Sequence, residues 1–280
     1  MDDPESMAWP LKPRSTLSHW AQCIGAPLLR AAERAKARSE RRARARPEAR
    51  FQRLMETAHE IAAINPAGLP DFISAILRPL QAEHLLSIAE FGGTPDIEAD
   101  SWTFFGPAVR RRLFADDGST WRPTTHDPDQ HPMALARDLV LPWPWNHGRY
   151  VSALATIGST KGHAQSPAWL QRWQGPWRQD PLNHSVELWL PWRIGFVHGG
   201  NHSIAAGILA GEGVITPSSV YDFSYLFAEL RAEAKGFRRV DNGRWEAAVD
   251  DPRIAAVFEI GRLIYLAGQA ATPAGRCDSA

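Results

Sequence analysis

The sequence predicts an α+β protein, in which an N-terminal helical region is followed by a small mixed sheet with flanking helices. Two observations predict this class. Apolar residues recur with helical spacing between residues 51 and 91. After residue 138, short apolar or alternating segments typical of strands are separated by glycine turns and helical segments. The chain has 280 residues, 44% of them hydrophobic, which is enough for one large domain or two small ones.

The first 50 residues are expected to form a flexible arm that contains a basic helix. Between residues 29 and 50, arginines and a lysine stand among alanines, which favours a helix without an apolar face. A solvated helix or linker is one interpretation of this segment. The other is an arm that contacts the phosphates of nucleic acid or, less favoured, an acidic protein.

Residues 51–137 are expected to form a helical and irregular subdomain. Helical faces are predicted over 51–62, 71–77 and 81–91, and Pro79 is expected to break or kink the helix between the last two. Residues 94–137 have no clear periodicity, although 101–105 is compatible with a strand.

Residues 138–270 are expected to form an α/β domain, and residues 271–280 a disordered tail. The expected strands are 139–141, 185–190, 194–197 and 214–215, and the main helices are 149–157, a helix after residue 200, and 252–267.

Composition excludes several classes of protein. Lys and Arg total 31 and Asp and Glu total 31, so no net charge attracts nucleic acid to the whole surface. The two cysteines, Cys23 and Cys277, lie far apart and predict neither a disulfide framework nor a thiolate metal site. Neither a secretory signal nor a run of about 18 apolar residues is apparent. We therefore expect a cytoplasmic protein without a membrane partner, and the sequence does not indicate its oligomeric state.

The turn after the strand 194–197 is the strongest candidate site. Gly199, Gly200, Asn201, His202 and Ser203 combine a glycine turn with a helix N-terminus, an arrangement whose free N–H groups suit a phosphate. We assign the two glycines, Asn201 and Ser203 to phosphate binding, and His202 to phosphate binding or acid–base chemistry. In the alternative interpretation, His202 only supports the turn, and Asn201 and Ser203 only cap the helix.

Two further Asn-His pairs occur at expected element ends. Asn146-His147 follows one strand, and Asn183-His184 precedes another. Ligands of open α/β sheets bind at strand ends, so these four residues are predicted to support the same site. A metal site built from His147, His184 and His202 is the less favoured interpretation, and no metal site is predicted.

Residues 138–213 run strand, helix, long loop, strand, strand, glycine turn, helix. This order resembles the core of the ParB/sulfiredoxin-like superfamily, whose glycine turn grips nucleotide phosphates. Two departures matter: Asn201 stands where sulfiredoxins carry their catalytic cysteine, and Ser203 stands where most relatives carry arginine. The chain is also similar to an uncharacterised bacterial family with a Pro-Trp-Asn motif, here 144–146, and a Gly-Asn-His-Ser motif, here 200–203.

The resemblance implies nucleotide- or nucleic-acid-directed phosphate chemistry by a hydrolase, phosphotransferase or nuclease, with ATP or CTP and Mg²⁺ as candidate cofactors. Such chemistry needs a carboxylate, and Glu187 is the first candidate because its strand neighbours the turn. Asp180 is the second candidate. The alternative is a non-catalytic nucleotide- or DNA-binding module of a plasmid, phage or defence system, so the sequence leaves open whether the protein is an enzyme. The candidates to replace the missing arginine are Arg149, Lys161, Arg178 and Arg193.

Overall fold

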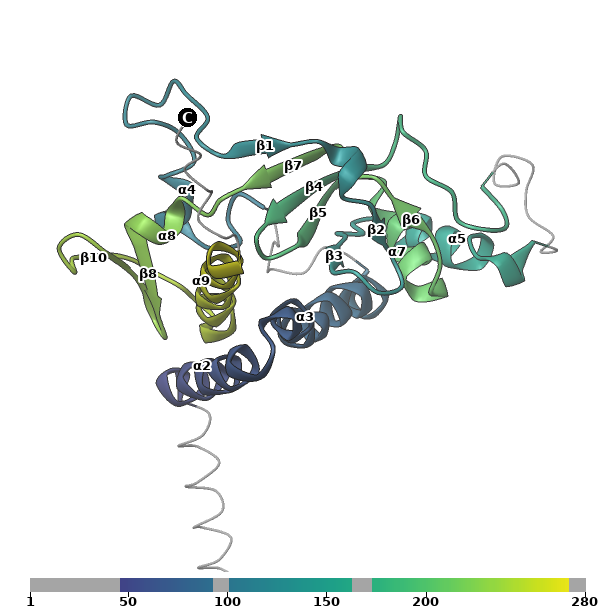
Figure 1. The fold of residues 1–280 in the computed structure, drawn as a ribbon. Coiled ribbons are helices and arrows are strands. Elements are labelled where there is room, and N and C mark those ends of the chain that lie inside the picture. The colour runs from purple at the N-terminus through teal and green to yellow at the C-terminus, as the bar shows by residue number, and fades with distance from the viewer. Residues whose placement is uncertain (1–45, 93–100, 163–172, 272–280) are drawn as a thin grey trace, which may run out of the picture.

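The computed structural model describes residues 46–92, 101–162 and 173–271 (Figure 1). The predicted basic arm lies almost entirely outside these ranges. The predicted tail also lies outside them, apart from its first residue. The described part mixes helices with three small sheets, which confirms the α+β class.

Two long helices form one side of the molecule (Figure 1). Helix α2 is Pro47–Ile64, the 3₁₀ turn η1 is Pro66–Gly68, and α3 is Leu69–Phe91. Of the two outcomes predicted at Pro79, the break is wrong, because α3 continues through the proline, and a kink is compatible with a continuous helix. Buried residues on both sides of the proline, among them Leu77 and Leu80, pack into the same core and hold the helix together.

A mixed five-stranded sheet lies at the centre. Its strands in spatial order are β1 (Thr124–His126), β7 (Ser219–Asp222), β4 (Ser185–Leu190), β5 (Ile194–Gly199) and β3 (Val140–Leu141). Strands β4 and β5 pair antiparallel, whereas β3 runs parallel to β5 and β7 runs parallel to β4. The expected strands at 185–190 and 194–197 are confirmed, the second with two further residues.

Hydrophobic side chains cover both faces of this sheet. Trp189 and Phe196 face one core cluster, which also takes in residues of α2, α3 and the C-terminal helix. Val186 and Val197 face the other, together with the helices that follow β3 and β5. The first cluster joins residues between 58 and 260, so the hydrophobic core is continuous across the boundary expected at residue 137.

The remaining helices are short apart from one. They are α4 (Pro107–Arg110), η2 (Pro128–Gln130), α5 (His147–Thr156), η3 (Ser159–Lys161), α7 (Asn201–Ala210), α8 (Leu226–Glu229) and α9 (Pro252–Ala271). The strand considered at 101–105 is wrong, because this segment forms turns that bury Phe104 and Phe105.

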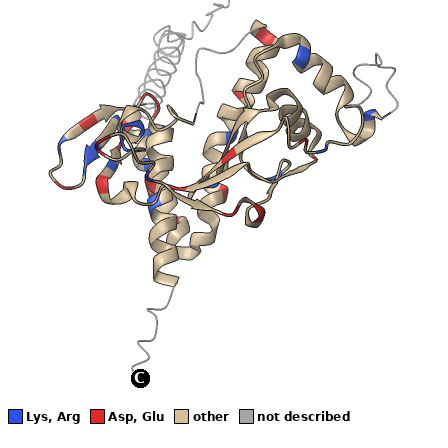
Figure 2. Ribbon diagram, turned by 90° about the horizontal axis from the view of Figure 1, so that it is seen from above, with Lys and Arg blue, Asp and Glu red and all other residues tan. Residues whose placement is uncertain are grey.

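Two smaller sheets complete the fold. A three-stranded antiparallel sheet consists of β8 (Leu230–Glu233), β9 (Gly236–Arg239) and β10 (Trp245–Ala248), and β2 (Met133–Ala134) pairs with β6 (Val214–Ile215). The three-stranded sheet was not predicted, because its alternation is interrupted by several arginines. Acidic and basic residues lie side by side on it (Figure 2).

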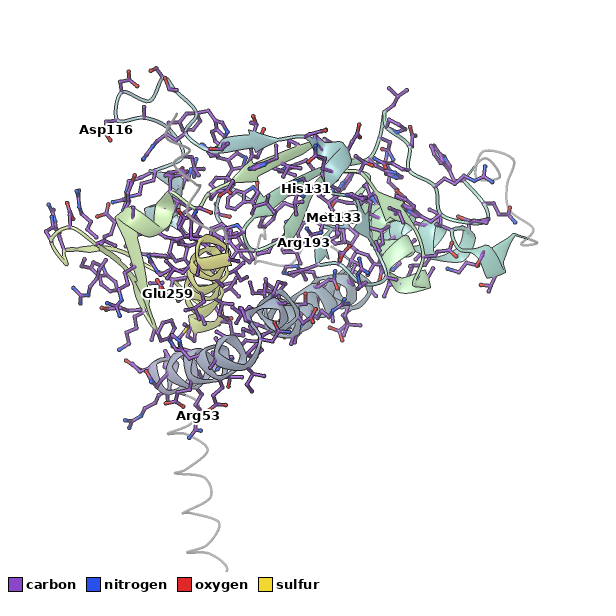
Figure 3. The ribbon with its side chains drawn as sticks, in the orientation of Figure 1. Arg53, Asp116, His131, Met133, Arg193 and Glu259 are labelled. Atoms are coloured by element: carbon purple, nitrogen blue, oxygen red, sulfur yellow. The ribbon has the colours of Figure 1, made fainter. Side chains whose placement is uncertain are left out.

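Helix α9 is long and apolar enough to cross a membrane by length and composition, although Glu259 and Arg262 interrupt its apolar residues. Its residues 254–261 are buried, most of them in the larger core cluster, and a core helix can meet the same criterion. Glu259 on this helix accepts the N–H of Ala232 in β8 at 2.6 Å and pairs with Arg262 at 2.7 Å (Figure 3). This polar contact fixes α9 against the three-stranded sheet.

Candidate functional site

A cleft of about 750 Å³ lies at the carboxyl ends of β3 and β5. The two strands are parallel neighbours, and each leads into a helix, α5 after β3 and α7 after β5. Residues of both first turns line the cleft, among them Gly148 and Arg149 of α5 and His202 of α7. The N-termini of two helices therefore open onto one cavity, at the sheet edge where ligands of α/β folds bind.

The two glycines of the β5–α7 turn are required by close packing. A Cβ atom on Gly199 would lie 2.6 Å from the carbonyl oxygen of Asn183. A Cβ on Gly200 would lie 2.2 Å from Cδ2 of His184, and its φ of +74° belongs to the left-handed region that favours glycine. The backbone of the turn thus rests directly on the Asn183-His184 segment.

The side chain of His184 supports the β5–α7 turn and lies outside the cleft lining. Its Nδ1 accepts the N–H of Asp180 at 2.9 Å, which places the ring proton on Nε2. Nε2 lies 2.6 Å from Oγ of Ser203, and that hydroxyl donates to the carbonyl of Gly200 at 2.9 Å. The ring is buried and stacked on Trp177 with centroids 5.0 Å apart, and burial lowers the pKa of His184. His184 in this tautomer is a donor to Ser203, so it does not act as a base that activates the hydroxyl.

Asn201 and His202 join α7 to the loop that begins α5. The side-chain oxygen of Asn201 accepts the N–H of Trp143, and Nε2 of His202 accepts the N–H of Asn146 at 3.1 Å. Asn146 in turn caps α5, because its Oδ1 accepts the N–H of Arg149 at 2.9 Å. These bonds fix the position of the α5 N-terminus relative to the α7 N-terminus.

The charges at the cleft favour an anion. Arg149 lines the cleft, with its guanidinium 5.2 Å from the ring centroid of Trp145. Burial, and secondly the charge of Arg149, lower the pKa of His202, which agrees with an Nε2 that accepts a hydrogen bond. Asp180 is the carboxylate among the described lining residues. One guanidinium and two positive helix ends therefore outweigh one carboxylate.

Glu187 lies beside the cleft without lining it. Its carboxylate accepts a hydrogen bond from the indole N–H of Trp189 and lies 3.3 Å from Nε2 of His198, which does line the cleft. His198 is absent from the sequence-based site. The register could have revealed it, because Glu187 pairs with Phe196 and His198 is the next residue on the same face of β5.

The sequence profile of one protein family, described as a family of unknown function, matches residues 33–271. The chain belongs to the DUF6710 family. No curated protein and no solved structure matches this DUF6710 chain.

The structure of this DUF6710 protein brings most of the predicted residues together. His184 lies behind the turn rather than in the cleft wall, and His147 is exposed on the first turn of α5 outside the lining. The predicted residues that line the cleft are Asn146, Asn183, Gly199, Gly200, Asn201, His202 and Ser203.

Of the four candidate cations, Arg149 is the one in the cleft wall. Lys161 donates to the carbonyl of Ile157 at 2.8 Å, and Arg178 is exposed outside the lining. Arg193 lies near His131 in the turn between β4 and β5, at the opposite end of β5 (Figure 3). Within the described ranges of this DUF6710 chain, no group of three His, Cys, Asp or Glu side chains could hold a metal ion.

Proposed function

We propose that the cleft binds the phosphate groups of a nucleotide or nucleic acid, and that the protein hydrolyses or transfers a phosphate there. The observation that carries this proposal is the convergence of the α5 and α7 N-termini on one cleft that also contains Arg149. Each helix N-terminus presents backbone N–H groups without partners inside the helix and about half a positive charge. Two such ends with a guanidinium form a strong anion site.

Arg149 supports this reading in a second way. The superfamily that the sequence resembles places an arginine where this chain has Ser203. In the folded chain Arg149 lies in the wall of the same cleft as Ser203 and can supply the missing positive charge from the neighbouring helix. We accordingly propose a ParB/sulfiredoxin-like arrangement of β3, β5 and the helices α5 and α7 that follow them. In this arrangement the positive charge is on α5, where the superfamily has it on the helix equivalent to α7.

The remaining lining suits the base of a nucleotide. Trp145 is 51% exposed and contacts the ring of His202 edge-on, with centroids 5.6 Å apart. Exposed indoles beside a phosphate site stack on nucleobases, and each such contact contributes about 1–3 kcal/mol. ATP or CTP therefore fits the cleft better than a simple inorganic anion.

Asp180, the carboxylate among the described lining residues, would be the protein ligand of a Mg²⁺ ion bound together with a nucleotide. Mg²⁺ is usually bound by one or two carboxylates together with substrate phosphates and water, and a single aspartate fits that pattern. The ion would neutralise phosphate charge. Arg149 and the helix N–H groups would orient the phosphates.

Calorimetric titration tests the proposal. Inorganic phosphate, pyrophosphate, ATP and CTP are titrated into the full chain with and without Mg²⁺, and at least one is expected to bind. Arg149→Ala should weaken binding about tenfold or more, since a charge-assisted hydrogen bond contributes roughly 1.5–3 kcal/mol. Arg178→Ala removes an exposed arginine outside the lining and should leave affinity unchanged. Equal effects of the two variants, or no binding of any probe, would overturn the phosphate site.

The alternative is a non-catalytic module that binds nucleotide or DNA, with the basic segment at 29–50 adding phosphate contacts. Removal of residues 1–45 tests this part. A DNA-binding arm predicts weaker DNA affinity and a shallower dependence on salt, whereas a solvated linker predicts no change in either.

A further inference from the structure

We infer that the groove between α2 and α3 is a docking site for an acidic amphipathic helix of a partner protein. This groove and the cleft share no lining residue among the described residues. The inference therefore goes beyond the proposed phosphate chemistry and is independent of it.

Two helical stripes form the walls of the groove, which has a volume of about 430 Å³. Both stripes have the spacing i, i+3, i+4 and i+7, so each is one face of its helix. They consist of Arg50, Arg53, Leu54 and Thr57 on α2 and of Phe72, Ala75, Ile76 and Pro79 on α3, and Arg253 at the start of α9 completes the lining. A third helix fits such a groove, because its side chains pack between the ridges of the two neighbouring helices.

The floor of the groove is apolar. Leu54 and Phe72 are half-buried against the larger core cluster, and Ile76 is buried within it, whereas Ala75 is exposed. Each stripe extends about 11 Å along its helix, which corresponds to about two turns of an occupant. Partners that bind in this way place apolar side chains at i, i+3, i+4 and i+7 in the groove, so the floor calls for the apolar face of a helix.

The rim of the groove is basic. Its described lining contains three arginines and no carboxylate. Arg253 donates to Asp251 at 2.7 Å, whereas Arg50 and Arg53 are exposed and have no carboxylate within ion-pair distance among the described residues. Figure 3 shows that Arg53 projects from α2 into the solvent. These two guanidinium groups can pair with carboxylates that flank the apolar face of a partner helix.

The charge of the neighbouring sequence agrees with an acidic occupant. Arg41, Arg42, Arg44 and Arg46 stand just before α2 in the sequence, so basic residues continue along the chain from the groove. A nucleic acid would match these charges, but its phosphate backbone would leave the apolar floor uncovered. A helix with an apolar face between acidic residues matches both the floor and the rim, which is why we favour a protein partner.

The test measures binding of a synthetic helical peptide of about 16 residues to the full chain by fluorescence anisotropy. The peptide carries leucines at i, i+3, i+4 and i+7 with glutamates on both sides of this stripe, and it is expected to bind more weakly as salt is raised. Replacement of its glutamates by lysines removes the charge complementarity, and replacement of its leucines by serines removes the apolar anchors. Each change should weaken binding about tenfold or more.

Variants of the protein test whether the peptide lies in the groove. Ala75→Glu puts a carboxylate on the floor and Arg53→Glu reverses a charge on the rim, and each should weaken binding about tenfold or more. Ala89→Glu is the matched control, because Ala89 is an exposed alanine of the same helix outside the lining. Arg149→Ala removes the cation of the cleft and should also leave the affinity for the peptide unchanged. Circular dichroism and urea midpoints show whether each variant is folded.

The outcomes that overturn the docking site are distinct. One is peptide binding that Ala75→Glu and Arg53→Glu leave intact, and another is no binding of the acidic peptide at about millimolar concentration. Single-stranded DNA and phosphatidylglycerol vesicles are measured in parallel, and binding of either one in place of the peptide, lost in Ala75→Glu, would assign the groove to another class of occupant. Self-association of the full chain that Ala75→Glu removes would assign it to a second copy. None of these outcomes bears on the calorimetric test of the cleft.

Discussion

Replacement of Gly200 by alanine tests how the turn is built. The residue has a φ of +74°, where a side chain costs about 1–2 kcal/mol. The new Cβ would also lie 2.2 Å from Cδ2 of His184. That ring cannot move freely, because Asp180 and Ser203 hold its two nitrogens. Overpacking of this kind adds about 1–3 kcal/mol, so Gly200→Ala should destabilise the protein by roughly 2–5 kcal/mol in total.

The control lies at the other end of the same helix. Gly211 has a φ of +70°, but a Cβ there would meet nothing within 4 Å among the described residues. Gly211→Ala should therefore show only the backbone term of about 1–2 kcal/mol. Urea unfolding gives both values, and the difference measures the contact with His184.

A double-mutant cycle isolates that contact. In a His184→Ala background the clash is removed, and the cost of Gly200→Ala should fall to that of Gly211→Ala. If Gly200→Ala destabilises no more than Gly211→Ala in the wild-type background, or if its cost is unaffected by His184→Ala, the packing argument is refuted.

Three other substitutions, and one control at an exposed pair, test the packing and charge of the core. Burial lowers the pKa of His84 to about 4, and neither ring nitrogen has a partner among the described residues, so the folded state prefers the neutral ring. The contribution of neutral His84 to the free energy of unfolding should be fully present above the unfolded-state pKa of about 6.5, and it should be lost towards pH 4, by at most about 3 kcal/mol. Urea titrations at each pH should show that His84→Leu flattens this decline. Gly261→Ala would place a Cβ 1.9 Å from Nε1 of Trp192 and should destabilise by about 1–3 kcal/mol, so an unchanged urea midpoint contradicts the packing. Glu259→Gln removes one partner of a nearly buried ion pair and should cost about 3 kcal/mol or more, whereas Asp241→Asn in an exposed pair should leave the urea midpoint nearly unchanged, and similar shifts for both would contradict this prediction.

Local sequence patterns predicted the elements that decide the cleft. The strands predicted at 185–190 and 194–197 follow from alternating or continuous apolar residues, and the glycine turn with the helix after it follows from Gly199 and Gly200. The three-stranded sheet escaped prediction because arginines such as Arg239, which pairs with Asp241, interrupt the period of two. The continuity of α3 through Pro79 escaped it because packing overrides a local breaker.

Side-chain roles were less predictable than positions. Asn146 and Asn183 reach the cleft as predicted, but whether a histidine faces ligand or core depends on contacts distant in sequence. The ring of Trp177 covers His184, a contact that no local pattern indicates, and His198 faces Glu187 across two strands, a contact that follows only from the register of β4 and β5.

The side chains of the Gly-Gly-Asn-His-Ser motif are used mainly in building the site. Asn201 and His202 bind the loop before α5, and Ser203 binds His184 and Gly200. What the motif can offer a ligand is therefore its backbone N–H groups, and these carry no chemistry beyond attraction for an anion. A positively charged side chain in the cleft must therefore come from outside the motif. Arg149 on α5 is such a side chain in the cleft lining, so its replacement should weaken the binding of an anion while the turn, which Asn201, His202 and Ser203 build, persists.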